Sequence, residues 1–122
     1  MTVLVVEDDP DIRLVVSEIL SSAGYSVLQS TNGAEALITL QDKNPHVILL
    51  DMRMPVMDGW EFAKQYHNLH DHHSHIHPRI VVMTAAHDAF QRRNEIQADG
   101  VLSKPFDMQQ LLAAVSNGTD GP

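Results

Sequence analysis

Short apolar runs alternate along the chain with segments of helical periodicity, and this alternation constrains the fold more than any other feature. Four of the five runs are near-continuous, which is typical of strands covered on both faces. The runs lie at Val3–Val6, Val27–Leu28, Val47–Leu50, Ile80–Met83 and Val101–Leu102. Because strands that alternate with helices pair in parallel, we expect an α/β fold: a doubly wound (βα)5 unit whose five-stranded parallel sheet has helices on both faces.

The helical segments carry start and stop signals. Asp9 followed by Pro10 is typical of an N-cap and a first helical position, and Gly24 is typical of a helix end. The stretches Asn32–Glu35 and Asp107–Gln110 each have the form of a capping box. The predicted helices span about residues 10–23, 33–43, 59–69, 88–97 and 108–116.

Size and composition narrow the functional classes. The 122 residues fit one domain, to which we assign residues 1–116, with residues 117–122 as a flexible tail or the start of a linker. A net charge of −8 argues against a nucleic-acid-binding surface, and the absence of Cys excludes disulfides and thiol chemistry. Since no apolar run reaches the length of a membrane span and no signal-like stretch opens the chain, we expect a cytoplasmic protein.

Acidic residues directly follow the first and third apolar runs. Glu7 and Asp8 end the run Val3–Val6, and Asp51 ends the run Val47–Leu50. The carboxyl ends of parallel strands form the ligand-binding edge of an open α/β sheet. Three carboxylates meeting at this edge would repel one another unless a cation lay among them. The pattern therefore predicts metal-assisted phosphate or acyl chemistry centred on Asp51.

Five separated motifs resemble those of response-regulator receiver domains, the phospho-acceptor modules of two-component signalling. They are Glu7-Asp8-Asp9, Asp51-Met52-Arg53-Met54-Pro55, Met57-Asp58-Gly59, Met83-Thr84-Ala85 and Lys104-Pro105-Phe106. Each motif is weak alone, but their joint occurrence after the first, third, fourth and fifth runs is highly specific. The resemblance covers about residues 2–116 and implies the flavodoxin-like form of the (βα)5 fold.

The resemblance implies a phospho-acceptor and a metal site. Asp51 would accept a phosphoryl group from a phosphohistidine of a sensor histidine kinase or a histidine phosphotransfer protein. Asp8 and Asp51 would ligate Mg2+, or alternatively Mn2+, with Glu7 acting through water. The family's third protein ligand is the backbone carbonyl two residues past the phospho-acceptor, here Arg53.

The resemblance also implies how phosphorylation is read out. Thr84 would hydrogen-bond the phosphoryl group, and Lys104 would pair with Asp51 through a typically cis bond to Pro105. The face formed by residues 88–97, 101–102 and 108–116 would then act on a partner, an output domain or a second copy of the chain. Receivers often carry an aromatic ring three residues before the Lys, whereas this chain has Val101. We therefore do not expect coupling between Thr84 and an aromatic ring.

Two further segments depart from the common pattern. Arg53 and Ala86 occupy positions that tune dephosphorylation in the family, and Ala86 offers no polar group to position an attacking water, so we expect slow autodephosphorylation. The segment His67–His77 holds six of the eight histidines. Its spacing would allow Zn2+, Ni2+ or Cu2+ binding or a response to pH, and a polar, variable loop is the plainer interpretation.

Other functional classes fit the residues less well. A phosphohydrolase of the haloacid dehalogenase type needs an Asp two residues after the nucleophile, where this chain has Arg53. An FMN-binding module needs a phosphate-cradling loop where this chain has Glu7–Asp9. A degenerate receiver would lack part of the set Asp8, Asp51, Thr84 and Lys104. We therefore expect a signalling switch and not an enzyme, with a single-domain regulator, a longer regulator and a hybrid histidine kinase left open as its setting.

Overall fold

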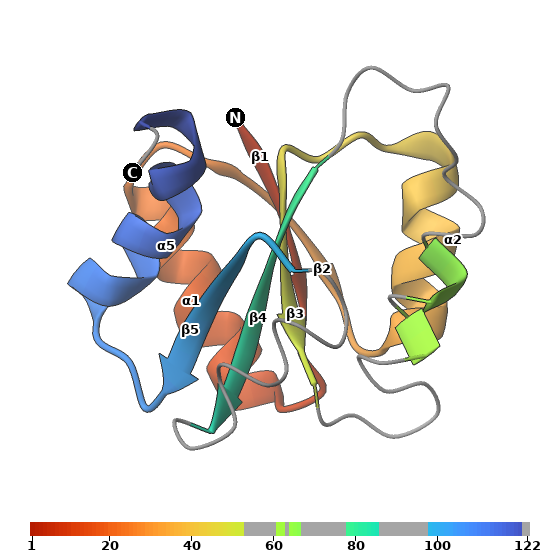
Figure 1. Ribbon diagram of the computed structural model, residues 1–122, viewed down its shortest axis with the longest axis horizontal. Helices are drawn as coiled ribbons and strands as arrows, with labels where there is room; N and C mark the ends of the chain where they lie inside the picture. Colours follow the sequence, from red (N-terminus) through yellow and green to blue (C-terminus); the bar gives the residue numbers. More distant parts are fainter. Residues whose placement is uncertain (53–60, 63, 67–77, 86–97, 121–122) are drawn as a thin grey trace.

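Five parallel strands form one sheet in the order β2-β1-β3-β4-β5 in the computed structural model (Figure 1). The structure describes residues 1–52, 61–62, 64–66, 78–85 and 98–120, and of residues 85 and 117–120 the backbone alone. The strands are β1 (Thr2–Val6), β2 (Ser26–Ser30), β3 (Val47–Asp51), β4 (Arg79–Ala85) and β5 (Gly100–Lys104). The predicted parallel sheet is confirmed.

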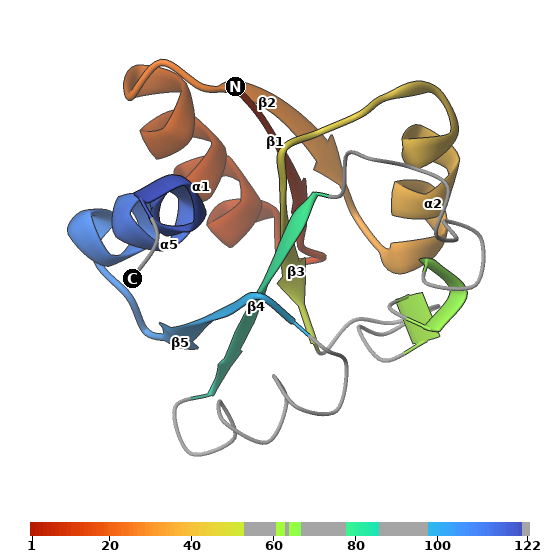
Figure 2. The same ribbon diagram turned by 45° about the horizontal axis from the view of Figure 1, so that its top comes forward.

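Helices cover both faces of this sheet, as the doubly wound arrangement requires. Figures 1 and 2 show α1 (Pro10–Ser22) and α5 (Met108–Asp120) on one face and α2 (Gly33–Asp42) on the other. Residues 61–62 and 64–66 are helical and lie on the side of α2. The predicted helix 88–97 lies outside the described residues.

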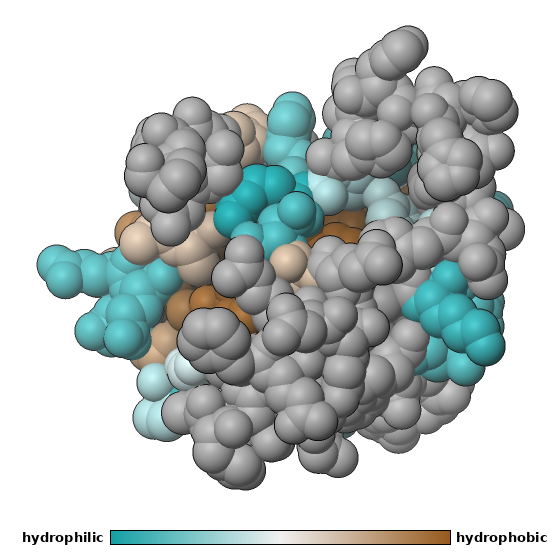
Figure 3. Space-filling model, in the orientation of Figure 1, coloured by the Kyte–Doolittle hydropathy of each residue, from teal (hydrophilic) through white to brown (hydrophobic). Residues whose placement is uncertain are grey.

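The two faces of the sheet bury separate cores. Successive strand residues point to opposite faces, so Ile48 and Leu50 pack toward α2 while Val47 and Leu49 pack toward α1 and α5. Every residue of β3 is buried. This explains why the third apolar run is continuous. Where the described residues are visible in Figure 3, hydrophobic areas lie beside hydrophilic ones.

The start and end of α1 follow the predicted signals. The Asp9 carboxylate accepts hydrogen bonds from the backbone N–H groups of Asp11, at 2.9 Å, and Ile12, at 3.3 Å. Gly24 follows the helix with φ of 99°, a conformation that favours glycine. The Asp9 cap holds the start of α1 directly after the acidic residues that follow β1, and Gly24 lets the chain turn from α1 toward β2.

The two predicted capping boxes have different outcomes. At α5, Gln110 N–H donates to the Asp107 carboxylate at 2.8 Å and Asp107 N–H donates to the Gln110 side chain at 2.9 Å, which confirms the box. At α2, Asn32 accepts from Glu35 N–H at 2.8 Å, but the Glu35 carboxylate bonds the backbone N–H of Thr31 at 3.0 Å and its hydroxyl at 2.8 Å. A capping box predicts that the Glu35 carboxylate accepts from the backbone N–H of Asn32. This prediction is wrong, because Thr31 offers two donors to the same carboxylate.

Helix α5 continues to Asp120, four residues beyond Ser116, at which we place the end of the domain. A helix that has already formed adds one hydrogen bond for each further residue, so extension is easier than a new start. The predicted tail is therefore helical as far as Asp120. Among the described residues, no helix is both long and apolar enough to cross a membrane.

Candidate functional site

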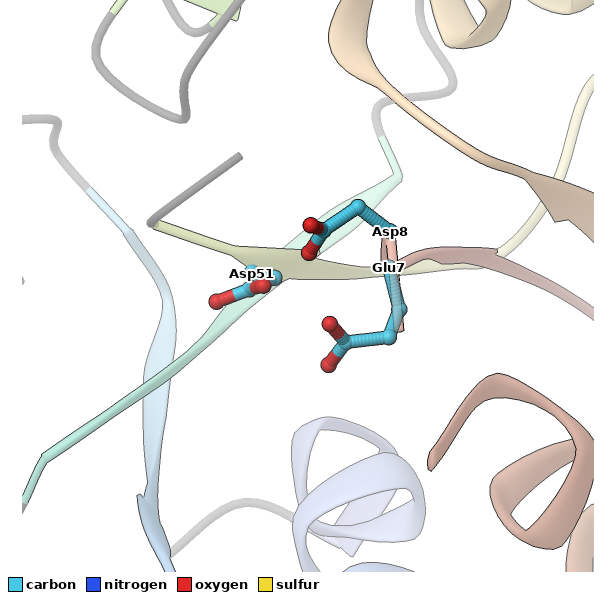
Figure 4. A group of neighbouring side chains, drawn as sticks. All are labelled: Glu7, Asp8 and Asp51. Atoms are coloured by element: carbon cyan, nitrogen blue, oxygen red, sulfur yellow. The ribbon is translucent and has the colours of Figure 1, made fainter. Parts of the chain in front are cut away.

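Three carboxylates meet at the carboxyl edge of the sheet. Glu7 and Asp8 directly follow β1, and Asp51 ends β3, which is the neighbour of β1 in the sheet. Figure 4 shows the side chains of Glu7 and Asp8 extending toward Asp51, and one oxygen of each carboxylate lies within 4.8 Å of the others. The predicted convergence of these residues is confirmed. The chain turns in opposite directions from β1 and β3, which makes this edge the switch point of the sheet.

Two of the three carboxylates are buried. The exposed fraction is 1% for Glu7 and 4% for Asp51, whereas Asp8 is partly exposed. The pKa of Glu7 is raised to about 7: burial raises it most, the hydrogen bond to Asp51 and the charge of Asp51 also raise it, and Lys104 lowers it. Glu7 and Asp51 therefore hold negative charge in a place where water screens it poorly.

Lys104 supplies a cation to both buried carboxylates. Its Nζ lies 3.1 Å from Glu7 Oε1 and 3.4 Å from Asp51 Oδ1. Strand β4 separates β5 from β3, so the long Lys side chain has to reach across about 10 Å of sheet. Burial lowers the pKa of Lys104, but the charges of Asp51 and Glu7 and the hydrogen bonds to them give a net increase, so Lys104 is charged at neutral pH. The bond to Pro105 is cis, as the resemblance implies.

Thr84 lies at the same edge of the sheet. It is buried near the end of β4, one residue past Met83, which is the register partner of Asp51. Val101 of β5 pairs with Val82 and packs against the core on the α2 face. Val101 is therefore an ordinary strand residue in this structure.

Several predicted functional positions lie outside the described residues. These are Arg53, Ala86 and the segment His67–His77. Their predicted roles in metal ligation, dephosphorylation and metal or pH sensing stay predictions.

The carboxylate cluster suits a hard divalent cation. Mg2+ prefers oxygen ligands in octahedral geometry and keeps several waters, so it is usually held by one or two carboxylates. Asp8 and Asp51 offer such oxygens. Both oxygens of Glu7 already accept hydrogen bonds, from Lys104 Nζ at 3.1 Å and from Asp9 N–H at 3.3 Å. This chemistry fits a contribution of Glu7 through water.

Two features of the site do not emerge from sequence reasoning. Arg13 of α1 donates a hydrogen bond from Nη1 to the Glu7 carbonyl at 2.9 Å. The sequence feature that could indicate this contact is the position of Arg13 four residues after the N-cap Asp9, in the first part of the helix. A cavity of about 540 Å³ lies beside Lys104 between α1 and the segment after β5. Its lining residues are Asp11, Ile12, Val15, Val16, Lys104, Pro105 and Phe106. The cavity depends on packing between distant segments, so no local signal marks it.

Comparison with known proteins agrees with this geometry. The family model for the response regulator receiver domain matches residues 3–116. Sporulation initiation phosphotransferase F of Bacillus subtilis (strain 168) is 33% identical over 115 residues, which cover 93% of this chain and 89% of that protein. The DNA-binding transcriptional regulator NtrC of Escherichia coli (strain K12) is 39% identical over 115 residues, but these cover 24% of that longer protein.

A solved structure is similar over nearly its whole length. The chemotaxis response regulator CheY4 of Vibrio cholerae superposes with a TM-score of 0.83 at 34% identity, covering 95% of this chain and 96% of that one. The sequence match, the five-stranded parallel sheet and the acidic edge agree with one another. The chain therefore belongs to the response-regulator receiver domains, the phosphorylatable switches of two-component signalling.

Proposed function

We propose that Asp51 is the phospho-acceptor of this receiver and that it takes its phosphoryl group from a phosphohistidine of a sensor histidine kinase or a histidine phosphotransfer protein. The observation that carries the proposal is the placement of Asp51 between a cation and two further carboxylates: Lys104 Nζ lies 3.4 Å from Asp51 Oδ1, and oxygens of Glu7, Asp8 and Asp51 lie within 4.8 Å. We place this transfer in the cytoplasm, where ATP phosphorylates the donor histidine.

In the proposed transfer, a carboxylate oxygen of Asp51 attacks phosphorus. The new P–O bond forms as the P–N bond to the donor imidazole breaks, and the imidazole nitrogen keeps the electron pair of that bond and takes up a proton. Bound Mg2+ would neutralise charge on the phosphoryl oxygens, which is the main requirement of such a transfer. Asp8 and Asp51 would hold the ion directly, Glu7 would act through water, and the Arg53 carbonyl is the further ligand implied by the family. Mn2+ is the alternative ion.

Lys104 and Thr84 would then stabilise the phosphorylated state. Lys104 is charged and touches Asp51, so it can pair with the phosphoryl group once the carboxylate has become an acyl phosphate. Thr84 is buried at the same edge and would donate its hydroxyl hydrogen to a phosphoryl oxygen. We propose that the resulting change alters the face that we predict from the sequence for residues 88–97, β5 and α5, and so controls a partner, an output domain or a second copy. Self-phosphorylation and slow self-dephosphorylation would be the protein's own chemical steps.

The proposal is tested by incubating the protein with acetyl phosphate and Mg2+ and recording the intact mass. Wild type should gain one phosphoryl group, and the gain should disappear in Asp51→Asn and in the presence of EDTA. Asp42→Asn is the matched control, because Asp42 is exposed at the end of α2. If Asp51→Asn gains the same mass as wild type, Asp51 is not the acceptor.

A further inference from the structure

We infer that Arg13 is a positioning residue that orients the acidic segment between β1 and α1 and so raises the affinity of the Glu7, Asp8 and Asp51 cluster for Mg2+. The inference rests on the proposed function and names a residue outside the five motifs. Arg13 does not belong to the carboxylate cluster itself. It acts through the backbone that carries two of the three carboxylates.

Arg13 binds the acidic segment at two points. Its guanidinium Nη1 donates to the Glu7 carbonyl at 2.9 Å in a partly buried contact. Its backbone N–H donates to the Asp9 carbonyl, also at 2.9 Å. Asp8 lies between these two carbonyls in the chain. One residue of α1 therefore holds the backbone on both sides of a proposed metal ligand.

The peptide groups on either side of Asp8 are both hydrogen-bonded. The Glu7–Asp8 peptide accepts from Arg13 through its carbonyl, and the Asp8–Asp9 peptide donates through its N–H to Glu7 Oε2 at 3.3 Å. Rotation about the backbone of Asp8 would break one bond or the other. These bonds hold the backbone from which the Asp8 side chain extends toward Asp51, as Figure 4 shows. Groups that orient metal ligands raise metal affinity even though they do not touch the ion.

Charge alone predicts the opposite effect. A guanidinium beside a cation site repels the incoming ion, so removal of the Arg13 charge should strengthen Mg2+ binding if the charge were its main contribution. Removal of the hydrogen bond should weaken Mg2+ binding if Arg13 orients the ligands. The sign of the change therefore separates the two roles.

The experiment is a calorimetric titration of the full chain with MgCl2. We expect the Mg2+ dissociation constant of Arg13→Met to be about tenfold higher than that of wild type. Arg13→Lys keeps the charge and one donor, and its dissociation constant should lie between the two. Lys43→Met is the matched control: Lys43 is exposed just after α2, and its removal takes away one positive charge without touching the acidic segment. Its dissociation constant should equal that of wild type.

A second readout separates positioning from loss of folded protein. With acetyl phosphate as donor, the Mg2+ concentration that gives half the maximal phosphorylation rate should rise in Arg13→Met, while the rate at saturating Mg2+ should stay near that of wild type. Unchanged or tighter Mg2+ binding in Arg13→Met overturns the inference, and if that variant does not fold, an unchanged dissociation constant in Arg13→Lys overturns it. Failure of wild type to bind Mg2+ and to gain a phosphoryl group would instead refute the proposed function.

Discussion

Replacement of Lys104 by Met should destabilise the metal-free protein by an amount that grows with pH. Lys104 contacts two carboxylates that are 1% and 4% exposed. Burial and Asp51 raise the pKa of Glu7, Lys104 lowers it, and together they place it at about 7. Above pH 7, wild-type Glu7 is mostly ionised beside the ammonium group. Without that cation, Glu7 keeps its proton above pH 7 in the folded state, because a second buried negative charge would face Asp51 unneutralised.

The magnitude follows from the two folded-state pKa values. In wild type the folded-state pKa of Glu7 is about 7, and in Lys104→Met it lies higher. Between these two pKa values, Glu7 of the folded variant holds a proton that wild type has released. The unfolding free energy of the variant therefore falls relative to that of wild type as pH rises through this range. Between the two pKa values, the difference in unfolding free energy grows by about 1.4 kcal/mol for each pH unit. Loss of the contact between Lys104 and Asp51 adds to this difference. Below pH 6 both proteins carry protonated Glu7, and the pH-dependent part vanishes.

The assay is urea unfolding in EDTA at pH 6, 7, 8 and 9, followed by far-ultraviolet circular dichroism. Lys43→Met should differ from wild type by the same small amount at every pH, because Lys43 is exposed. In a Glu7→Gln background, Lys104→Met should lose its pH dependence, since Gln does not titrate. A difference between wild type and Lys104→Met that is equal at pH 6 and pH 9 would refute the coupling of Lys104 to Glu7.

Three smaller perturbations test the scaffold by urea unfolding. Leu49→Ala should lower the unfolding free energy by about 3–5 kcal/mol, because Leu49 is 0% exposed between β3 and the helices of one face; a loss below about 1 kcal/mol would contradict this packing. Asp107→Ala should lower it by about 1 kcal/mol through loss of the α5 cap, with Asp107→Asn retaining most of the stability. The hydrogen bonds from Thr31 lower the pKa of Glu35, so wild type should lose stability relative to Glu35→Gln as pH falls below 4.5; an equal response of both proteins to acid would argue against these bonds.

Local patterns predicted the elements well. The continuous run Val47–Leu50 marked a strand buried on both faces, and the structure buries all of β3. The reciprocal bonds of Asp107 and Gln110 involve residues three apart, so the chain itself brings them together. The partner of the Glu35 carboxylate is Thr31, one residue before the Asn32 that the capping-box pattern predicts, and this choice depends on how the chain enters α2.

The convergence of the three carboxylates is predictable from the chain, because parallel strands bring their carboxyl ends to one edge. Glu7, Asp8 and Asp51 end neighbouring strands and meet as predicted. The sequence does not predict the contact of Arg13, because its partner, the Glu7 carbonyl, is placed by the path of the chain between β1 and α1. The sequence shows that position 101 is Val and not an aromatic residue, and the structure adds that this side chain packs against the core.

The sequence by itself determined which residue types end each strand and therefore which chemistry the edge of the sheet can support. Only the tertiary structure decided the charge balance of that edge. The pKa of Glu7 depends on burial to 1% exposure, on the neighbouring Asp51, and on a Lys side chain that reaches over from β5. These terms are set by distances between segments that are far apart in the chain, and Coulomb energies and desolvation change steeply with such distances.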